Sequence, residues 1–154
     1  MSDLQTSFYF SLSITGNDSS SDAAFQEASG LIAQMDTEDV VSGGENRFKY
    51  RLPSNVTYQN LVLKRGVAKE ASPLIEWCQQ IFNSRLAKPI VTKNVMLHLL
   101  NKAGKPGMSW GFVKAYPVKW VMGDLKSQES SVLIETIELA YRYCEVTDPR
   151  SKAN

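Results

Sequence analysis

One histidine and two cysteines are the side chains in this sequence most able to carry out catalysis or bind a metal. His98 lies within the apolar run Met96-Leu97-His98-Leu99, and Cys78 and Cys144 lie far apart. A lone histidine in such a run is typical of a half-buried structural side chain. Two distant cysteines match neither a disulfide framework nor a zinc-binding pattern. We therefore expect no catalytic residue, no metal and no cofactor.

Paired acids and glycine turns are the next candidates for chemistry. Glu135 and Glu138 are offset by three, which places them on opposite faces of a strand and prevents them from acting on one bond. Gly43-Gly44 and the turn 104–107 lack the Lys-Ser or Lys-Thr that completes a phosphate-binding loop. These glycines are better explained as turns.

The segment Arg47-Phe48-Lys49-Tyr50-Arg51 alternates cations with aromatic side chains. This pattern fits a nucleic-acid stacking groove, and it equally fits a strand with buried aromatics and outward cations. The net charge of +1 over the whole chain favours the strand.

Charge is divided unevenly along the chain. Residues 1–46 hold eight acidic residues and neither Lys nor Arg, a net charge of −8, whereas residues 47–154 hold all 17 basic residues and eight acids, a net charge of +9. Such a division is compatible with a solvated surface. It also offers two unlike patches that neighbouring copies could bring together.

The length of 154 residues suits one domain, and 43% hydrophobic residues suffice for a packed core. Neither an apolar run of membrane-spanning length nor a secretory signal is present, so we expect no insertion into a membrane by this chain alone. The domain is expected to cover residues 1–154, with a polar C-terminal tail at 143–154.

The elements expected around these residues are mostly strands. Alternating apolar residues or turn signals predict strands at 8–14, at 24–36 as two short strands with a kink at Gly30, and at 47–52, 58–65, 95–99, 110–113 and 133–142, with an exposed loop at 36–45. The sequence therefore predicts a mainly β fold with one α-helix: a small antiparallel β-barrel or sandwich with an external amphipathic helix.

That helix is predicted to begin at Ser72 as N-cap and Pro73 as first helical residue. Leu74, Trp77, Cys78 and Ile81 then form one apolar face. We expect this face to pack on the sheet, with binding of a partner protein as the alternative.

Four motifs resemble those of a known family: the tail-tube proteins of contractile phages and phage-tail-like injection systems. They are Phe25-Gln26-Glu27-Ala28-Ser29-Gly30-Leu31, Leu61-Val62-Leu63-Lys64-Arg65-Gly66, Ala115-Tyr116-Pro117-Val118-Lys119 and Ile134-Glu135-Thr136-Ile137-Glu138-Leu139-Ala140. They occur in the family's order and cover residues 25–141. One departure is the segment 36–51, where a Gly-Gly loop and a basic strand replace the family's compact acidic-basic hairpin.

The resemblance implies a tail-tube-like domain that forms hexameric rings, which stack into a rigid inner tube driven by a contracting sheath. The implied partners are other copies of the chain, the sheath, the baseplate or spike, and a cargo or tape-measure protein in the lumen. The implied location is the bacterial cytoplasm during assembly and then a phage tail, or an extracellular or membrane-anchored injection particle. No catalysis or cofactor is implied.

Contacts between subunits are expected along an arm around residues 37–52. The candidate contact residues are the charged ones of this region, namely Asp36, Glu38, Asp39, Arg47, Lys49 and Arg51.

Three alternatives remain open at this point. The chain could form the initiator ring that joins the spike and baseplate to the tube, or a tube of the type VI secretion kind that carries effectors. It could also be a monomeric barrel that binds a small ligand between Trp110, Tyr116 and Trp120.

Overall fold

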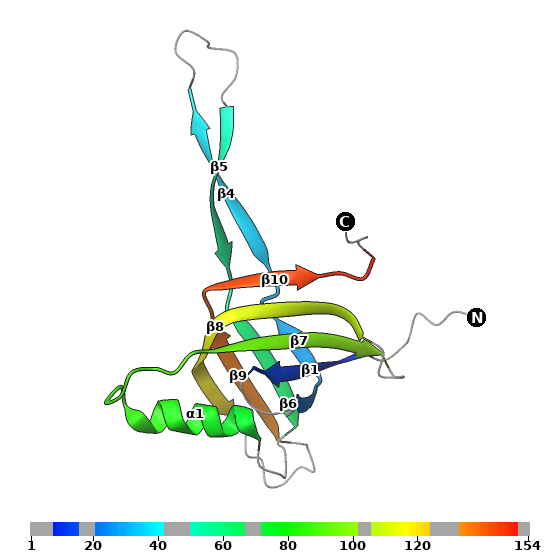
Figure 1. Ribbon diagram of the computed structural model, residues 1–154, viewed down its shortest axis with the longest axis vertical. Coiled ribbons are helices and arrows are strands. Elements are labelled where there is room, and N and C mark those ends of the chain that lie inside the picture. Colours follow the sequence, from blue (N-terminus) through cyan, green and yellow to red (C-terminus); the bar gives the residue numbers. More distant parts are fainter. Residues whose placement is uncertain are drawn as a thin grey trace, which may run out of the picture.

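Strand β1 (Phe8–Ile14) carries the alternation that the sequence predicts, with Leu12 and Ile14 buried and the neighbouring Ser11 and Ser13 half-buried. Figure 1 shows this strand within a computed structural model of the chain. The structure describes residues 8–15, 21–41, 50–66, 72–101, 106–123 and 133–150.

The other elements follow in chain order. They are β2 (Ser21–Phe25), β3 (Glu27–Ser29), β4 (Ala33–Val40), β5 (Tyr50–Tyr58), β6 (Leu61–Gly66), α1 (Pro73–Ser84), β7 (Lys93–Asn101), β8 (Pro106–Met122), β9 (Ile134–Ala140) and β10 (Tyr143–Thr147). The mainly β architecture with one helix confirms the predicted fold class among the described residues.

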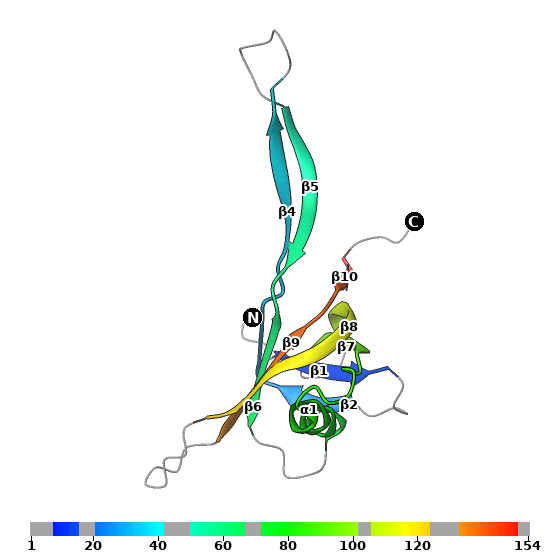
Figure 2. The same ribbon diagram turned by 90° about the vertical axis from the view of Figure 1, so that its left-hand side faces the viewer.

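The main sheet curls until its two ends meet. Its order is β2-β1-β7-β8-β9-β6-β3, and β10 also pairs with β8. The end strands β2 and β3 are consecutive in the chain, and Gln26 between them donates its backbone N–H to the Lys64 carbonyl at 3.0 Å. One continuous segment therefore joins both ends of the sheet, which makes the body barrel-like (Figure 2).

Strand β8 holds the two halves of the barrel together. Its first part pairs with β7 on one edge and β10 on the other, and its second part pairs with β9. The change of partner occurs near Lys114, whose φ of 54° bends the strand and whose N–H binds the Asn94 side chain at 2.9 Å. The sequence prediction limited this strand to residues 110–113, and these boundaries are wrong because β8 spans Pro106–Met122.

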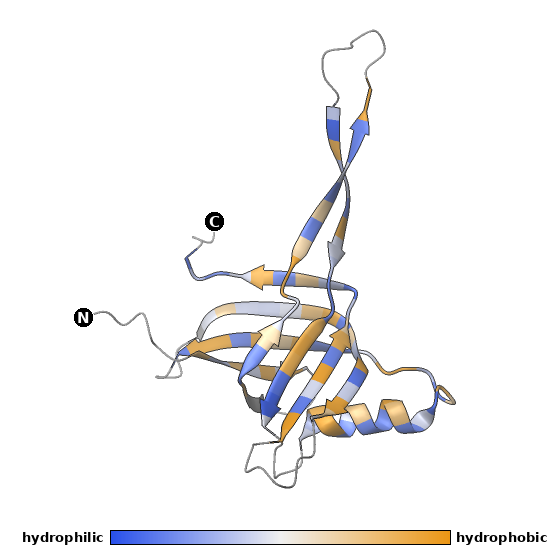
Figure 3. Ribbon diagram, turned by 180° about the vertical axis from the view of Figure 1, so that it is seen from behind, coloured by the Kyte–Doolittle hydropathy of each residue, from blue (hydrophilic) through white to orange (hydrophobic). Residues whose placement is uncertain are grey.

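The inner faces of the strands form the core. Figure 3 shows apolar and polar residues alternating along the strands, as expected when one face is buried. The largest fully buried side chains include Trp77 from α1, Phe25 at the junction of β2 and β3, and Phe112 from β8. Helix α1 covers one side of this barrel with an apolar face, as the sequence predicts.

Three further boundaries differ from the sequence prediction. The expected loop at 36–45 is wrong over its first part, because β4 continues to Val40. The predicted end of a strand at residue 52 is also wrong, because β5 continues through Pro53 beside a register shift, where proline is tolerated. The expected polar tail at 143–154 begins instead as strand β10.

Candidate assembly interface

Strands β4 and β5 pair with each other alone among the described strands and project from the barrel as a two-stranded arm (Figures 1 and 2). Every described side chain of the arm is exposed except Tyr58, which is half-buried at the base. An isolated two-stranded ribbon is at best marginally stable in water. The arm is therefore the part of this chain most in need of a second surface.

Large apolar side chains lie exposed along the arm, including Met35 with 57% of its surface accessible and Leu52 with 48%. Near the base, Met35 pairs with Val56 on one face. In the outer half, beyond a register shift, successive residues of β4 point to alternate faces. The outer residues that share the opposite face are Glu38, Val40, Tyr50 and Leu52. A covering surface must therefore contact both faces of the arm.

The candidate contact residues predicted from sequence lie along this arm, as far as the structure describes them. Asp36, Glu38, Asp39 and Arg51 are all exposed. Arg51 Nε lies 3.8 Å from Asp39 Oδ1, a surface ion pair worth little to the stability of the protomer. The other two candidates, Arg47 and Lys49, lie outside the described residues.

The arm joins the barrel at a fixed base. Gly30 adopts φ = 85°, and a Cβ atom at this position would lie 1.9 Å from the Asn60 carbonyl oxygen, so only glycine fits. On the other strand, the Gln59 carbonyl accepts a 2.6 Å hydrogen bond from the Tyr141 hydroxyl. The two points where the chain enters and leaves the arm, at Gly30 and at Gln59–Asn60, thus lie against each other. They also contact Tyr141 in the segment that follows β9.

Tyr141 connects the arm base to the core. Its ring lies 4.7 Å from the Phe112 ring and 5.8 Å from the Tyr58 ring, measured between centroids. Burial, and secondarily the nearby Cys144 and Tyr58, raise the pKa of Tyr141 to about 12. Burial also raises the pKa of the Cys144 thiol to about 11. Both groups are therefore protonated at neutral pH.

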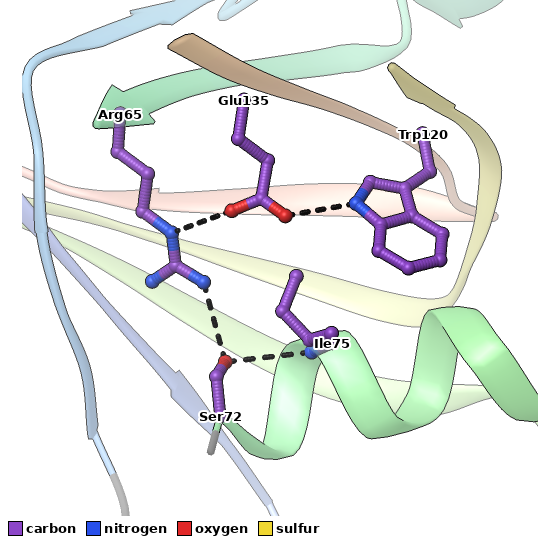
Figure 4. A network of polar contacts seen from close by, with 5 residues as sticks. All are labelled: Arg65, Ser72, Ile75, Trp120 and Glu135. Carbon is purple, nitrogen blue, oxygen red and sulfur yellow. Dashed lines mark hydrogen bonds and ion pairs between the residues drawn. The ribbon is translucent and has the colours of Figure 1, made fainter. Parts of the chain in front are cut away.

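A buried polar network fixes the start of α1 on the sheet (Figure 4). Arg65 Nε donates to Glu135 Oε2 at 3.3 Å, and the Trp120 indole N–H donates to Glu135 Oε1 at 2.8 Å. Another guanidinium nitrogen of Arg65 donates to the Ser72 hydroxyl oxygen, which also accepts the N–H of Ile75 as the N-cap of α1. One ion pair therefore ties β6, β8 and β9 to the helix N-terminus.

The residues predicted to pack the helix lie on the side of α1 that faces the barrel. Leu74, Trp77 and Cys78 are fully or almost fully buried, and Ile81 is partly buried against the same core. The Trp77 indole N–H donates to the Val91 carbonyl at 2.9 Å, which ties the helix to the segment that follows it.

The side chains considered first for chemistry have structural contacts. A ring nitrogen of His98 lies 2.8 Å from the Ser109 hydroxyl, and Trp110 lies in the core with 7% of its surface exposed. In the described parts of the chain, no three His, Cys, Asp or Glu side chains converge to hold a metal ion. The same parts contain no helix with the length and apolarity needed to cross a membrane.

Sequence reasoning missed the network around Arg65 and the anchor at Tyr141. A signal for the first was present, because Arg65 and Glu135 have the same strand parity as the buried Leu63 and Ile137. Tyr141 likewise shares the parity of the buried Ile137 and Leu139, which places it on the inner face, but no sequence pattern marks its hydrogen bond to the Gln59 carbonyl.

Comparisons with known proteins give consistent results. The family model of the T4-like virus tail tube protein gp19 matches residues 6–145. A chain from the cryo-EM structure of the anti-feeding prophage baseplate is 31% identical, with 96% of this chain and 97% of that chain covered and a TM-score of 0.71.

More distant structures share the fold. A chain from the sheath–tube complex of an extracellular contractile injection system, PVC, is 22% identical over 90% of this chain and 88% of that chain, with a TM-score of 0.70. Hcp1 from Salmonella typhimurium is 13% identical over 91% and 85%, with a TM-score of 0.54. No curated protein matches the chain.

Proposed function

We propose that copies of this chain close into hexameric rings that stack. The premise is that the chain belongs to the T4-like virus tail tube protein family and is a structural subunit of the inner tube of a phage tail or contractile injection system. Its proposed partners are the sheath around the tube, the baseplate and spike at one end of it, and a cargo or tape-measure protein in its lumen. Assembly takes place in the bacterial cytoplasm. The proposed role requires no catalysis.

The observation that carries this proposal is the uncovered arm. A chain that folded to function alone would gain nothing from a ribbon that exposes Met35, Leu52 and Tyr50 to water. In a ring or stack of rings, the same side chains are buried against other copies. Such contacts join unlike patches of neighbouring subunits, the kind of interface from which closed rings are built.

We propose that Asp36, Glu38, Asp39, Arg47, Lys49 and Arg51 are contacts between subunits. The four described members are exposed along the arm, where opposite charges on a neighbour could set its register. Their contribution should fall with salt, because exposed pairs are screened over about 10 Å at 0.1 M ionic strength. Rings insensitive to salt would assign the binding energy to apolar burial and sheet pairing instead.

A second candidate is a ring at the baseplate end of the tube. The chain is 31% identical to a protein of a baseplate structure, against 22% to proteins of a tube-terminating cap and a sheath–tube complex. This higher identity is the observation that supports an initiator ring as the second candidate. Particles that contain an initiator hold one ring or a few rings of it.

Electron microscopy of the purified protein, with its mass measured in parallel, tests the ring proposal. We expect six-fold rings or stacked tubes. Particles of another symmetry would contradict the hexamer, and a protein that remains a 17.2 kDa monomer both alone and with a baseplate template would contradict assembly altogether.

Counting subunits in intact particles separates the two positions. Quantitative mass spectrometry against the sheath protein should give a few rings for an initiator. Hundreds of copies per particle would instead assign the chain to the repeating tube.

A further inference from the structure

An apolar groove lies beside the C-terminal half of α1. It has a volume of about 660 Å³ and lies between the helix and residues 87–91, with Trp77 and Ile81 on the helix side and Pro89, Ile90 and Val91 on the other. The Trp77 indole bond to the Val91 carbonyl holds the two walls together. The groove is thus part of the folded helix corner.

The surface around this groove remains apolar and exposed. Val91 has 58% of its surface exposed and Ile90 40%, while Leu86 at the end of the helix has 73%. Leu86 and Arg85 both have positive φ, 62° and 51°, which turn the chain away from the helix axis. Figure 3 shows apolar residues alternating with polar ones along the helix and in the segment after it. Nothing in the described chain covers these side chains.

The arm and the groove lie at opposite ends of the molecule. In Figure 1 the arm extends upward along the longest axis, and α1 lies at the lower end of the barrel, on the same side of the picture as the arm. A shift of one copy along this axis would bring its arm toward the helix end of the next copy. This relation joins two unlike surfaces and repeats without limit.

Strand β4 and the surroundings of the groove carry charges of opposite sign, whereas the whole segment 33–58, which includes Arg47, Lys49 and Arg51, is close to neutral. The described part of the arm carries Asp36, Glu38 and Asp39 against a single cation, Arg51. At the groove, Lys88 forms part of the lining, Arg85 caps the helix, and Lys93 Nζ lies 5.6 Å from the centroid of the Trp77 ring. Acidic residues along an apolar ribbon thus match basic residues around an apolar groove.

We propose that this groove is the docking site for the β4–β5 arm of a second copy of the chain, in the next ring. The inference rests on the proposed stacking of rings and adds the acceptor surface for the arm. Apolar side chains of the arm fill the groove, and its acidic residues lie near Arg85 and Lys88.

A photo-crosslinking amino acid at Val91 tests the contact directly. This side chain is exposed, and the bond from Trp77 uses only the backbone carbonyl of Val91, which the substitution retains. After irradiation of assembled rings, mass spectrometry should identify cross-links to residues 33–41 or 50–58 of another copy. The same amino acid at Gln79, an exposed residue of α1 outside the groove lining, is the control and should give few or none.

Ile90→Asp provides an independent test of the same contact. A carboxylate buried in an apolar contact should reduce stacking about tenfold, measured as the fraction of rings in tubes. Gln79→Asp introduces the same charge on the same helix and should stack normally. Circular dichroism and melting of both variants should match the parent chain, because both positions are exposed.

The outcomes separate this proposal from the one it rests on. In stacked rings, cross-links from Val91 to a part of another copy outside the arm would overturn the docking site and leave the proposed tube in place. In intact particles, cross-links from Val91 to a sheath protein would overturn the docking site in the same way. Cross-links to the arm within unstacked single rings also overturn it. A chain that never associates overturns both proposals.

Discussion

The barrel and the arm are both built from antiparallel strands, but the barrel buries its apolar side chains and the arm exposes them. In the barrel, β6 alternates buried and half-buried residues, and Leu61 and Leu63 are fully inside. In the arm, β4 is as long as many barrel strands, yet every residue is exposed. The barrel is stabilised by its own side chains, whereas the arm needs those of another copy. Stability of the protomer and assembly of the tube should therefore respond to different substitutions.

The largest effect on the barrel is expected from Trp77→Ala. The indole is almost fully buried, and its removal leaves a cavity and an unpaired Val91 carbonyl, at a cost of about 3–5 kcal/mol. Urea unfolding of the unassembled protein measures this loss. Gln79→Ala on the exposed side of the same helix is the control, and a Trp77 variant as stable as that control would refute the packing of α1.

Glu135→Ala should be almost as costly. The Arg65 guanidinium would remain charged and buried with its hydrogen bond to Ser72 but without the Glu135 carboxylate, a defect worth about 3–5 kcal/mol. Replacing both residues with apolar ones, Arg65→Met with Glu135→Leu, should restore most of the stability. If the double variant unfolds as easily as the single one, the network is needed for more than charge balance.

Gly30→Ala acts at the boundary between the two regions. The positive φ alone makes alanine cost roughly 1–3 kcal/mol, and the new Cβ would collide with the Asn60 carbonyl. We expect a less stable protomer and impaired assembly, because the arm must change direction. Ser29→Ala, the exposed neighbouring position, should change neither unfolding nor assembly.

Alkaline pH should lower the unfolding free energy through the contact of Tyr141 at the arm base, by less than Gly30→Ala does. The folded pKa of Tyr141 is about 12 against an ordinary value of 10, so its stabilising contribution is complete below pH 10 and is lost between pH 10 and 12. Unfolding free energy measured across this range should fall less steeply in Tyr141→Phe. A residual fall between pH 9 and 11 is expected from Cys144, whose folded pKa is about 11.

The smallest effect on the protomer, and the sharpest contrast, is expected from Leu52→Ser. The side chain is 48% exposed on the arm, so unfolding of the unassembled chain should change by no more than about 0.5 kcal/mol. Tube formation, followed by sedimentation or electron microscopy, should nevertheless be impaired. Loss of protomer stability as large as in the core variants would show that the arm folds onto its own barrel.

The same contrast explains how much the sequence could predict. β1 and α1 are recognisable because each has one solvent-exposed face and one buried face within a single copy. The apolar residues therefore recur with a period of two in the strand and 3.6 in the helix. β4 has no buried face in the protomer, so its acidic residues follow no period of two and its sequence resembles that of an exposed loop. Pro53 and Pro117 suggested strand ends, yet both lie beside register shifts that accommodate them.

The way the arm enters the barrel has a mechanical consequence. β5 continues into β6 and β3 continues into β4, and Figure 2 shows the arm roughly in line with β6. A force along the arm therefore slides β6 lengthwise past β9, with which it pairs from Leu61 to Gly66. Because antiparallel hydrogen bonds lie across the strands, this sliding loads them all together instead of opening them one at a time. A tube subunit joined this way should resist sudden thrust better than one whose arm peeled away from a sheet edge.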